Sequence, residues 1–300
     1  MKKKTYLFAL MAMVLTLGSC SDNENGIGGE TSKYITVSTS IGNMTRVATD
    51  ANGGQTFEEG DEISVYAWTG DATVAPETRE RVVNNAINKL TNGSWVSTPQ
   101  MLWKNSRDKH YFIGVYPTAA ISDLSAGEYT FDANKQTESD LLVAVNPDGL
   151  SYSADAQQTV PLTFTHVMAK LAVNLTYKNQ WGGIPTVEKV VVGNAAKEAT
   201  INYLTKVVTP STTAKEDFSL PEITENTKYV SVIIPQEEVT QLTIVIGGKN
   251  FVYDNGTPFK LESGKITTVN LEVGRDEIKL GDVKITNWED GSTFSGEALN

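Results

Sequence analysis

The segment Ile63-Ser64-Val65-Tyr66-Ala67-Trp68 is the clearest indication of the fold class of this chain. Apolar residues recur along it at alternate positions, and the turn residues Gly60 and Asp61 stand just before it. Side chains that alternate with a period of two point to opposite faces of a β-strand. The segment Ile35-Thr36-Val37-Ser38-Thr39 has the same alternation. Both patterns predict strands.

Short segments of this kind, separated by turn residues, recur along the rest of the chain. Asn92-Gly93 and Gly247-Gly248 each separate two of them, and both dipeptides are typical of tight β-hairpins. Further strands are expected at Leu141–Val145, ended by Asn146-Pro147, and at Ile201–Val208, which runs up to Pro210. This spacing favours all-β sandwiches over layers of alternating helices and strands.

Two domains are expected in this all-β chain. Its length of 300 residues is large for one sandwich, and the polar segment Asp148–Gln158 separates two sets of strands. We therefore expect an N-terminal β-sandwich over residues 33–158 and a C-terminal β-sandwich over residues 159–300.

The first 32 residues have a different character. Lys2, Lys3 and Lys4 precede the uncharged apolar run Tyr6–Leu17, which has the length of a signal-peptide core and is too short to span a bilayer. Leu17-Gly18-Ser19-Cys20 then matches the lipobox of bacterial lipoproteins, and Cys20 is the only cysteine. We expect a signal peptide at 1–19, lipidation of Cys20, and a flexible tether over 20–32. The alternative is an ordinary secretory signal with a chance cysteine nearby.

Composition excludes several classes of site. One cysteine allows neither an internal disulfide nor a Cys-rich zinc site, and His110 and His166 are too far apart for a zinc-protease helix. Removal of residues 1–19, which carry three Lys and no acid, takes the formal net charge from −11 to −14. Such a chain is unsuited to nucleic acid, whose binding depends on Lys and Arg.

Motifs along most of the chain resemble those of one family, the fimbrillin-like lipoproteins related to type V pilus subunits. The order and spacing of these motifs carry the resemblance. They are Leu17–Cys20, Thr45-Arg46, Phe57-x-x-Gly60-Asp61-x-Ile63-x-Val65-Tyr66, Tyr111-Phe112-x-x-Val115-Tyr116-Pro117, Ser139–Ala144, Leu162-x-Phe164-x-His166-x-Met168-Ala169-Lys170-Leu171, Ile233–Gln236, Ser263-Gly264-Lys265 and Ile285-x-x-Trp288.

The resemblance implies two tandem transthyretin-like β-sandwiches and a maturation step. In polymerising members an Arg-specific protease cuts after the first strand, and a strand from a neighbouring subunit fills the groove left behind. Here the first strand would be Tyr34–Ile41, Arg46 the cleavage residue and Val47 the new N-terminus. Two alternatives stay open: Arg46 is an ordinary loop residue, or the chain is a tip, anchor or accessory subunit that keeps its lipid. Asp276–Asn300 is either a donated strand or the last strand of the second sandwich.

No pattern predicts catalysis, a cofactor or a metal. His166 and Lys170 stand four residues apart, but two basic groups make neither a nucleophile nor a metal site, so a partly buried His166 bonded to backbone is expected. His110 is expected at a strand edge. Among the five tryptophans, Trp68 and Trp288 are expected in the core, whereas Trp181 lies in a turn and is the most exposed candidate for stacking on a sugar.

These observations predict a surface-exposed fimbrillin-like lipoprotein that is a subunit or accessory component of a pilus and has a role in adhesion. Its partners would be other pilus subunits, through donor-strand insertion, the outer membrane, through the lipid on Cys20, and host or bacterial surface ligands. The alternative function is a monomeric, lipid-anchored glycan-binding protein, and an enzyme is not expected.

Overall fold

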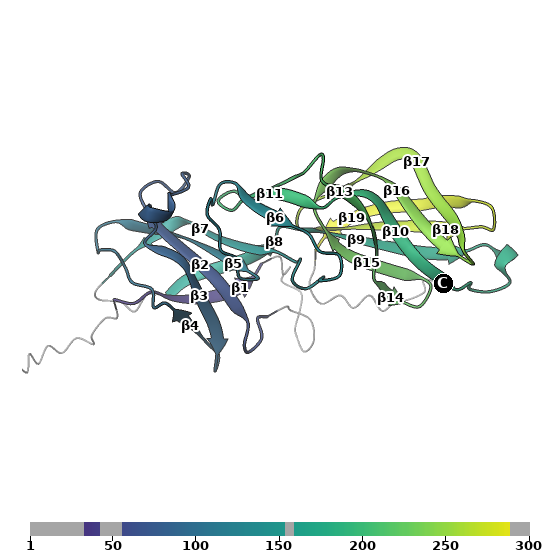
Figure 1. Cartoon of the computed structure of the whole chain (residues 1–300). Coiled ribbons are helices and arrows are strands. Elements are labelled where there is room, and N and C mark those ends of the chain that lie inside the picture. The colour runs from purple at the N-terminus through teal and green to yellow at the C-terminus, as the bar shows by residue number, and fades with distance from the viewer. Residues whose placement is uncertain (1–32, 43–55, 154–158, 289–300) are drawn as a thin grey trace, which may run out of the picture.

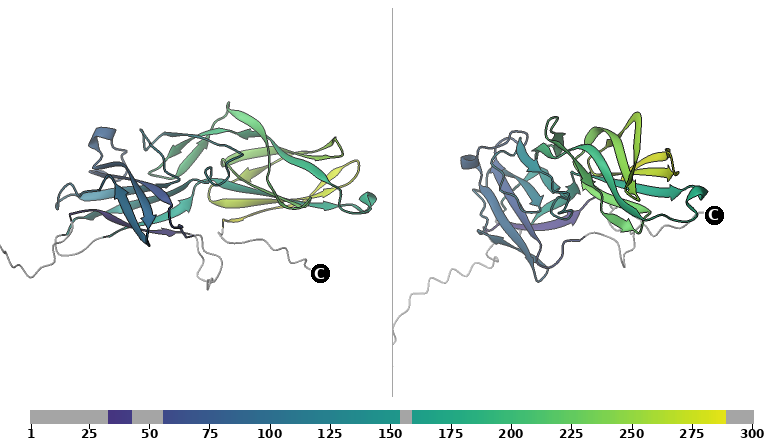
Figure 2. Two further views of the ribbon diagram at one scale, coloured as in Figure 1. Left: turned by 60° about the horizontal axis from the view of Figure 1, so that its bottom comes forward. Right: turned by 45° about the vertical axis from the view of Figure 1, so that its right-hand side comes forward.

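A computed structural model describes residues 33–42, 56–153 and 159–288 of the chain. In these residues the only helical elements are two 3₁₀ turns, η1 (Thr78–Glu80) and η2 (Asn179–Trp181), and the other regular elements are strands. The predicted all-β fold class is therefore confirmed. The strands form four sheets in an elongated molecule, with an N-terminal half and a C-terminal half end to end (Figures 1 and 2).

The N-terminal half is built on one seven-stranded sheet. In sheet order its strands are β1 (Thr36–Ile41), β8 (Thr159–His166), β7 (Leu142–Ser151), β5 (Lys109–Tyr116), β2 (Glu62–Thr69), β3 (Val83–Thr91) and β4 (Ser94–Thr98). β8 pairs in parallel with β1 and antiparallel with β7. β8 thus belongs to the sheet of the N-terminal half, and the next strand, β9 (Ala169–Tyr177), belongs to a sheet of the C-terminal half.

The two edges of this sheet meet. Tyr34, just before β1, forms an isolated antiparallel bridge with Leu102, which follows β4. The Ile35 N–H donates to the Met101 carbonyl at 2.9 Å, and the Trp103 N–H donates to the Lys33 carbonyl at 3.3 Å. The start of β1 thus closes the sheet on itself, between β8 and the segment after β4.

β2 contains the segment that indicates the fold class most clearly, and both of its faces are buried. Ile63, Val65 and Ala67 belong to the core enclosed by the seven-stranded sheet, whereas Tyr66 and Trp68 belong to a second core that continues into the C-terminal half. Alternate residues of β2 therefore pack into two different cores, one on each face of the strand.

Two sheets face each other in the C-terminal half. One contains β13 (Lys215–Ser219), β10 (Val187–Ala196), β16 (Gln236–Ile246) and β17 (Lys249–Leu261), in that order. The other contains β14 (Glu222–Thr224), β15 (Lys228–Ile233), β9 (Ala169–Tyr177), β18 (Lys265–Val273) and β19 (Ile278–Asn287). Buried residues of both sheets, such as Val190 and Leu242 of the first and Val173 and Leu271 of the second, share one core.

A small three-stranded sheet links the two halves. Its order is β12 (Val207–Pro210), β11 (Glu198–Asn202) and β6 (Gly127–Thr130). Because β6 comes from the N-terminal part of the chain and β11 from the C-terminal part, backbone hydrogen bonds join the halves directly.

Two strand predictions need correction. The segment predicted as one strand, Ile201–Val208, is a hairpin between β11 and β12, because the Asn202 carboxamide oxygen accepts the Leu204 and Thr205 N–H groups and Lys206 takes a φ of +61°. The strand expected to end at Val145 continues as β7 to Ser151, because a register irregularity opposite His110–Phe112 accommodates Pro147.

The two predicted hairpins are confirmed. Asn92 and Gly93 have φ values of +51° and +74° between β3 and β4. Gly247 and Gly248 have values of +59° and +71° between β16 and β17. Two consecutive positive φ values fit the type I′ turn that matches the twist of the flanking strands.

Candidate functional site

The most distinctive functional candidate is the groove that β1 fills. β1 lies at the edge of the seven-stranded sheet and pairs in parallel with β8 over its whole length, from Thr36 opposite Thr159 to Ile41 opposite Phe164. Along it the outward residues are exposed, and the inward residues Ile35 and Val37 are only 2% and 6% exposed. Burial of two such side chains contributes roughly 3–6 kcal/mol in total.

The groove beneath β1 is apolar. Its core contains Val160, Leu162 and Phe164 of β8, and Met101 and Trp103 from the segment after β4. On the outer face, side-chain hydrogen bonds connect Thr36 to Thr159 and Ser40 to Thr163. β1 therefore covers a hydrophobic floor and gives polar side chains to the surface, as the alternation in its sequence predicts.

An aromatic cluster forms the far wall of the groove. Phe57 makes edge contacts with Trp95, Tyr116 and Phe164 at centroid distances of 5.3, 5.3 and 5.1 Å. The Trp95 indole N–H donates to the Thr39 hydroxyl at 3.0 Å, so this wall contacts β1 through a polar group as well as through apolar surface.

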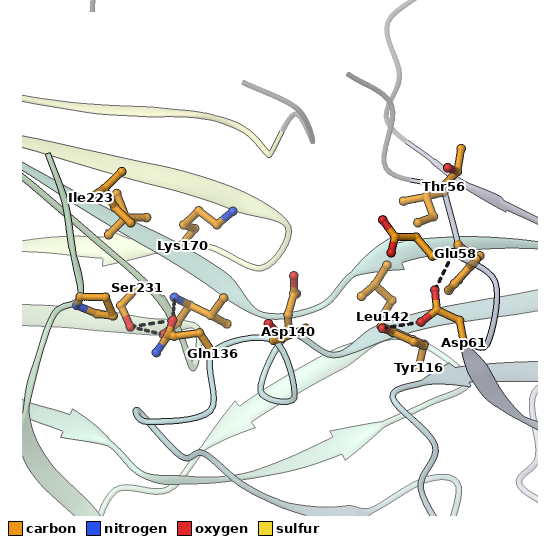
Figure 3. A pocket seen from close by; sticks show the side chains of 16 residues that line it. Thr56, Glu58, Asp61, Tyr116, Gln136, Asp140, Leu142, Lys170, Ile223 and Ser231 are labelled. Atoms are coloured by element: carbon orange, nitrogen blue, oxygen red, sulfur yellow. Dashed lines mark hydrogen bonds between the residues drawn. The ribbon is translucent and has the colours of Figure 1, made fainter. Parts of the chain in front are cut away.

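At the end of β1 the groove opens into a cavity of about 710 Å³ between the two halves. Figure 3 shows that Glu58, Asp61 and Tyr116 line it from the N-terminal half, whereas Lys170, Ile223 and Ser231 line it from the C-terminal half. Ile41 and Thr56 both lie on its wall. The chain thus leaves the described structure after Gly42 and re-enters it at Thr56 close to the junction of the halves.

His166 lies at this junction, and two of its partners had no signal in the sequence. The ring is buried, its Nδ1 is 2.8 Å from Asp140 Oδ1, and it stacks on Trp288 at 4.0 Å with an interplanar angle of 7°. Lys170 does come close, because its Nζ lies 4.1 Å from the centroid of the same Trp288 ring. The sequence gives no sign of the contacts with the Asp140 carboxylate and the Trp288 indole. Because His166 ends β8, Lys170 lies in β9 and Trp288 follows β19, this cluster connects the three strands.

His110 is the second residue of β5, near the start of the strand as expected, and its side chain is buried. Its Nε2 accepts the Lys104 N–H at 3.0 Å, and Trp103 packs edge-on against the ring at 5.0 Å. Burial lowers the pKa of His110 below its ordinary value. A neutral ring that accepts a backbone hydrogen bond is a structural element of the core.

The tryptophans offer no exposed platform for a sugar. All five lie in the described residues, where Trp68, Trp103 and Trp288 are buried. Trp181 is half-buried, since its indole N–H donates to the Val273 carbonyl at 3.0 Å and its ring contacts Phe251. The expectation that Trp181 is exposed for stacking therefore loses its basis.

Within the described ranges, no group of three or more His, Cys, Asp or Glu side chains could hold a metal ion. The same ranges contain no helix long and apolar enough to cross a membrane. Cys20, Arg46 and Val47, the residues predicted for lipidation and proteolytic maturation, lie outside the described residues.

Comparison with a protein-family model gives a match to the fimbrillin-like family over residues 45–288, which is most of the chain. This chain belongs to the fimbrillin-like family. A relative in Bacteroides uniformis, named "Putative fimbrium subunit Fim1C", is 24% identical over 97% of both chains. The resemblance carried by the sequence motifs is thereby confirmed.

Solved structures support the fold of this fimbrillin-like chain. Two proteins described as putative cell adhesion proteins, from Bacteroides uniformis and Bacteroides ovatus, have TM-scores of 0.61 and 0.62, each at 18% identity. They cover 86% and 85% of this chain, and the match spans 100% and 98% of their own chains. At this level of identity the likeness concerns the fold.

Proposed function

We propose that this fimbrillin-like chain is a surface-exposed, lipid-anchored pilus subunit that assembles by strand exchange and has a role in adhesion. The position of β1 supports this proposal most strongly. β1 is an edge strand at the N-terminal end of the fold, it fills an apolar groove, and the segment that contains Arg46 follows it directly.

Proteolysis between Arg46 and Val47 would separate β1 from the rest of the chain. The bonds that hold β1 would then be the non-covalent contacts with β8, with Met101–Trp103 and with the aromatic wall. Loss of β1 would expose the groove floor and the unpaired edge of β8. Such an edge accepts an extended segment from another chain through main-chain hydrogen bonds, with alternate side chains in the apolar slots.

The N-terminal segment fits attachment to the outer membrane before assembly. Lipidated Cys20 would follow a signal peptide at 1–19, and Cys20 is thirteen residues before Lys33, where the described fold begins. A fully extended tether of this length reaches about 45 Å. In a polymerised subunit cut at Arg46, the lipid and β1 would be lost together.

The described part of the C-terminal segment, up to Trp288, pairs within its own chain. β19 is the edge strand of the five-stranded sheet, paired with β18, and it ends beside the buried Trp288. It is therefore the last strand of its own sheet.

An Arg46→Ala variant in the native host tests the proposal. High-molecular-weight ladders of surface material are expected for the parent chain and lost in Arg46→Ala. Arg79→Ala is the matched control, since the Arg79 side chain is 80% exposed and lies in the 3₁₀ turn η1, outside β1 and the segment that follows it. Ladders that persist in Arg46→Ala would show that Arg46 is not the switch. An acylated monomer that binds polysaccharide would instead support the alternative function, a lipid-anchored glycan-binding protein.

A further inference from the structure

The side chains that β1 sends into its groove differ in chemistry. Ile35, which directly precedes β1, and Val37 and Ile41 within it are apolar, whereas Thr39 is the one polar residue among these four inward positions. Thr39 is half-buried and accepts the Trp95 indole N–H at 3.0 Å. The groove therefore has apolar slots for three residues and a hydrogen-bond donor for the third inward residue.

The donor is held in place by its surroundings. Trp95 belongs to β4, where it is opposite Leu90 of β3, and its ring packs edge-on against Phe57 with an interplanar angle of 82°. Phe57 in turn contacts Tyr116 and Phe164. Because Phe57 is itself packed against Tyr116 and Phe164, its contact with Trp95 restricts rotation of the indole and favours the direction of the N–H toward Thr39.

A hydrogen-bond donor held at one place in an apolar groove favours one register of the strand that binds there. A shift of one residue turns every side chain of β1 to the opposite face. A shift of two residues keeps the apolar face inward but places Val37 or Ile41 against Trp95 in place of Thr39. Neither side chain can accept a hydrogen bond, so the partly buried indole N–H would lose its partner. A buried donor left without an acceptor lowers the stability of the shifted pairing.

We propose that Trp95 is a specificity-determining residue that selects the register and the sequence of the strand in this groove. The preferred occupant is an extended segment in which two apolar inward residues are followed by a Ser or Thr and then by an apolar residue, as in Ile35-x-Val37-x-Thr39-x-Ile41. The apolar slots supply most of the affinity, and Trp95 distinguishes the correct register from the shift of two residues that the slots alone would accept. This inference rests on the proposed strand exchange.

Peptide exchange into the cut chain tests the inference. A chain that begins at Ser21, without the lipidated Cys20, would be cut at Arg46, with the single cut verified by mass, and incubated with a fluorescent peptide of residues 33–42. Three competitor peptides would be compared with the parent sequence. Two carry the single changes Thr39→Ser and Thr39→Val. The third carries both Val37→Thr and Thr39→Val, so its hydrogen-bond acceptor is moved by two residues. Loss of one hydrogen bond to a partly buried donor weakens binding by about fivefold.

We expect Thr39→Ser to compete as well as the parent peptide and Thr39→Val to compete about fivefold less well. The double variant should compete less well still, because its Thr also enters the apolar slot of Val37. In a Trp95→Phe chain, which keeps the ring contact with Phe57 but lacks the N–H, the parent and Thr39→Val peptides should differ by less than about twofold. Equal competition by parent and Thr39→Val peptides in the chain with Trp95 would overturn the inference, and so would undiminished discrimination in Trp95→Phe.

The same experiment separates this inference from the proposed function. If the cut chain takes up no peptide, strand exchange and the role of Trp95 both fail. If peptides exchange without regard to the residue at position 39, strand exchange stands and the role of Trp95 fails. The comparison among peptides uses the unmodified chain, so it stays decisive even if Trp95→Phe does not fold.

Discussion

Substitution of Ile35 by Ala tests how strongly β1 is bound in the uncut chain. Ile35 is 2% exposed and lies in the core enclosed by the seven-stranded sheet. Its backbone N–H also bonds to the Met101 carbonyl, where the sheet closes, and that bond is kept in the variant. Loss of a buried Ile side chain costs about 2–5 kcal/mol through lost transfer energy and a residual cavity.

For Ile35→Ala we expect the free energy of unfolding to fall by about 3 kcal/mol, because Ile35 lies near the start of β1, where the backbone can relax partly into the cavity. For a unit of 150–250 residues this corresponds to a fall in melting temperature of roughly 6–12 °C. Thermal unfolding followed by circular dichroism, together with urea titration, measures the change. Ser38→Ala is the matched control, since Ser38 is exposed on the outer face of the same strand and should change stability by less than about 0.5 kcal/mol.

A loss below about 1 kcal/mol in Ile35→Ala, or an equal loss in Ser38→Ala, would refute the reasoning. The inward face of β1 would then contribute little to the fold. An empty groove would in that case provide little driving force for uptake of another strand.

Three further changes have defined outcomes. Burial lowers the pKa of His110, so the unfolded chain binds a proton at this ring more readily than the folded chain does. The stability of the parent chain should therefore fall as pH drops below about 6.5. His110→Gln should flatten the dependence of melting temperature on pH between about 7.5 and 5.5. Trp288→Ala removes the ring stacked on His166 and should cost about 3–5 kcal/mol in urea titration, with Trp288→Phe closer to the parent. In Gly114→Ala the new Cβ would lie 2.6 Å from Phe164 Cζ in the groove floor, so the free energy of unfolding should fall by about 1–3 kcal/mol. An unchanged midpoint of urea unfolding would show that Phe164 can move aside without loss of stability.

Much of the fold could be predicted from local patterns. Alternation at Ile63–Trp68 and the turn dipeptides Asn92-Gly93 and Gly247-Gly248 specify strands and hairpins, because period and backbone conformation are properties of neighbouring residues. The hairpin within Ile201–Val208 has no Gly signal, since Lys206 takes the positive φ and Asn202 caps the turn.

Pairing between distant segments could not be predicted in the same way. β1 pairs with β8, which is more than a hundred residues later, and no local pattern specifies that partner. For the same reason the sequence suggests that His166 and Lys170 are close but gives no sign of Asp140 or Trp288. The bond from Trp95 to Thr39 depends on the closing of the sheet, so the sequence alone could not identify Trp95 as a residue of the groove.

The central claim is that β1 leaves this chain when the subunit polymerises. The most direct test is the intact mass of the subunit recovered from surface polymers of the native host. We expect a chain that starts at Val47, without Cys20 and its lipid. Polymers built from chains that still carry acylated Cys20 and residues 33–42 would contradict it.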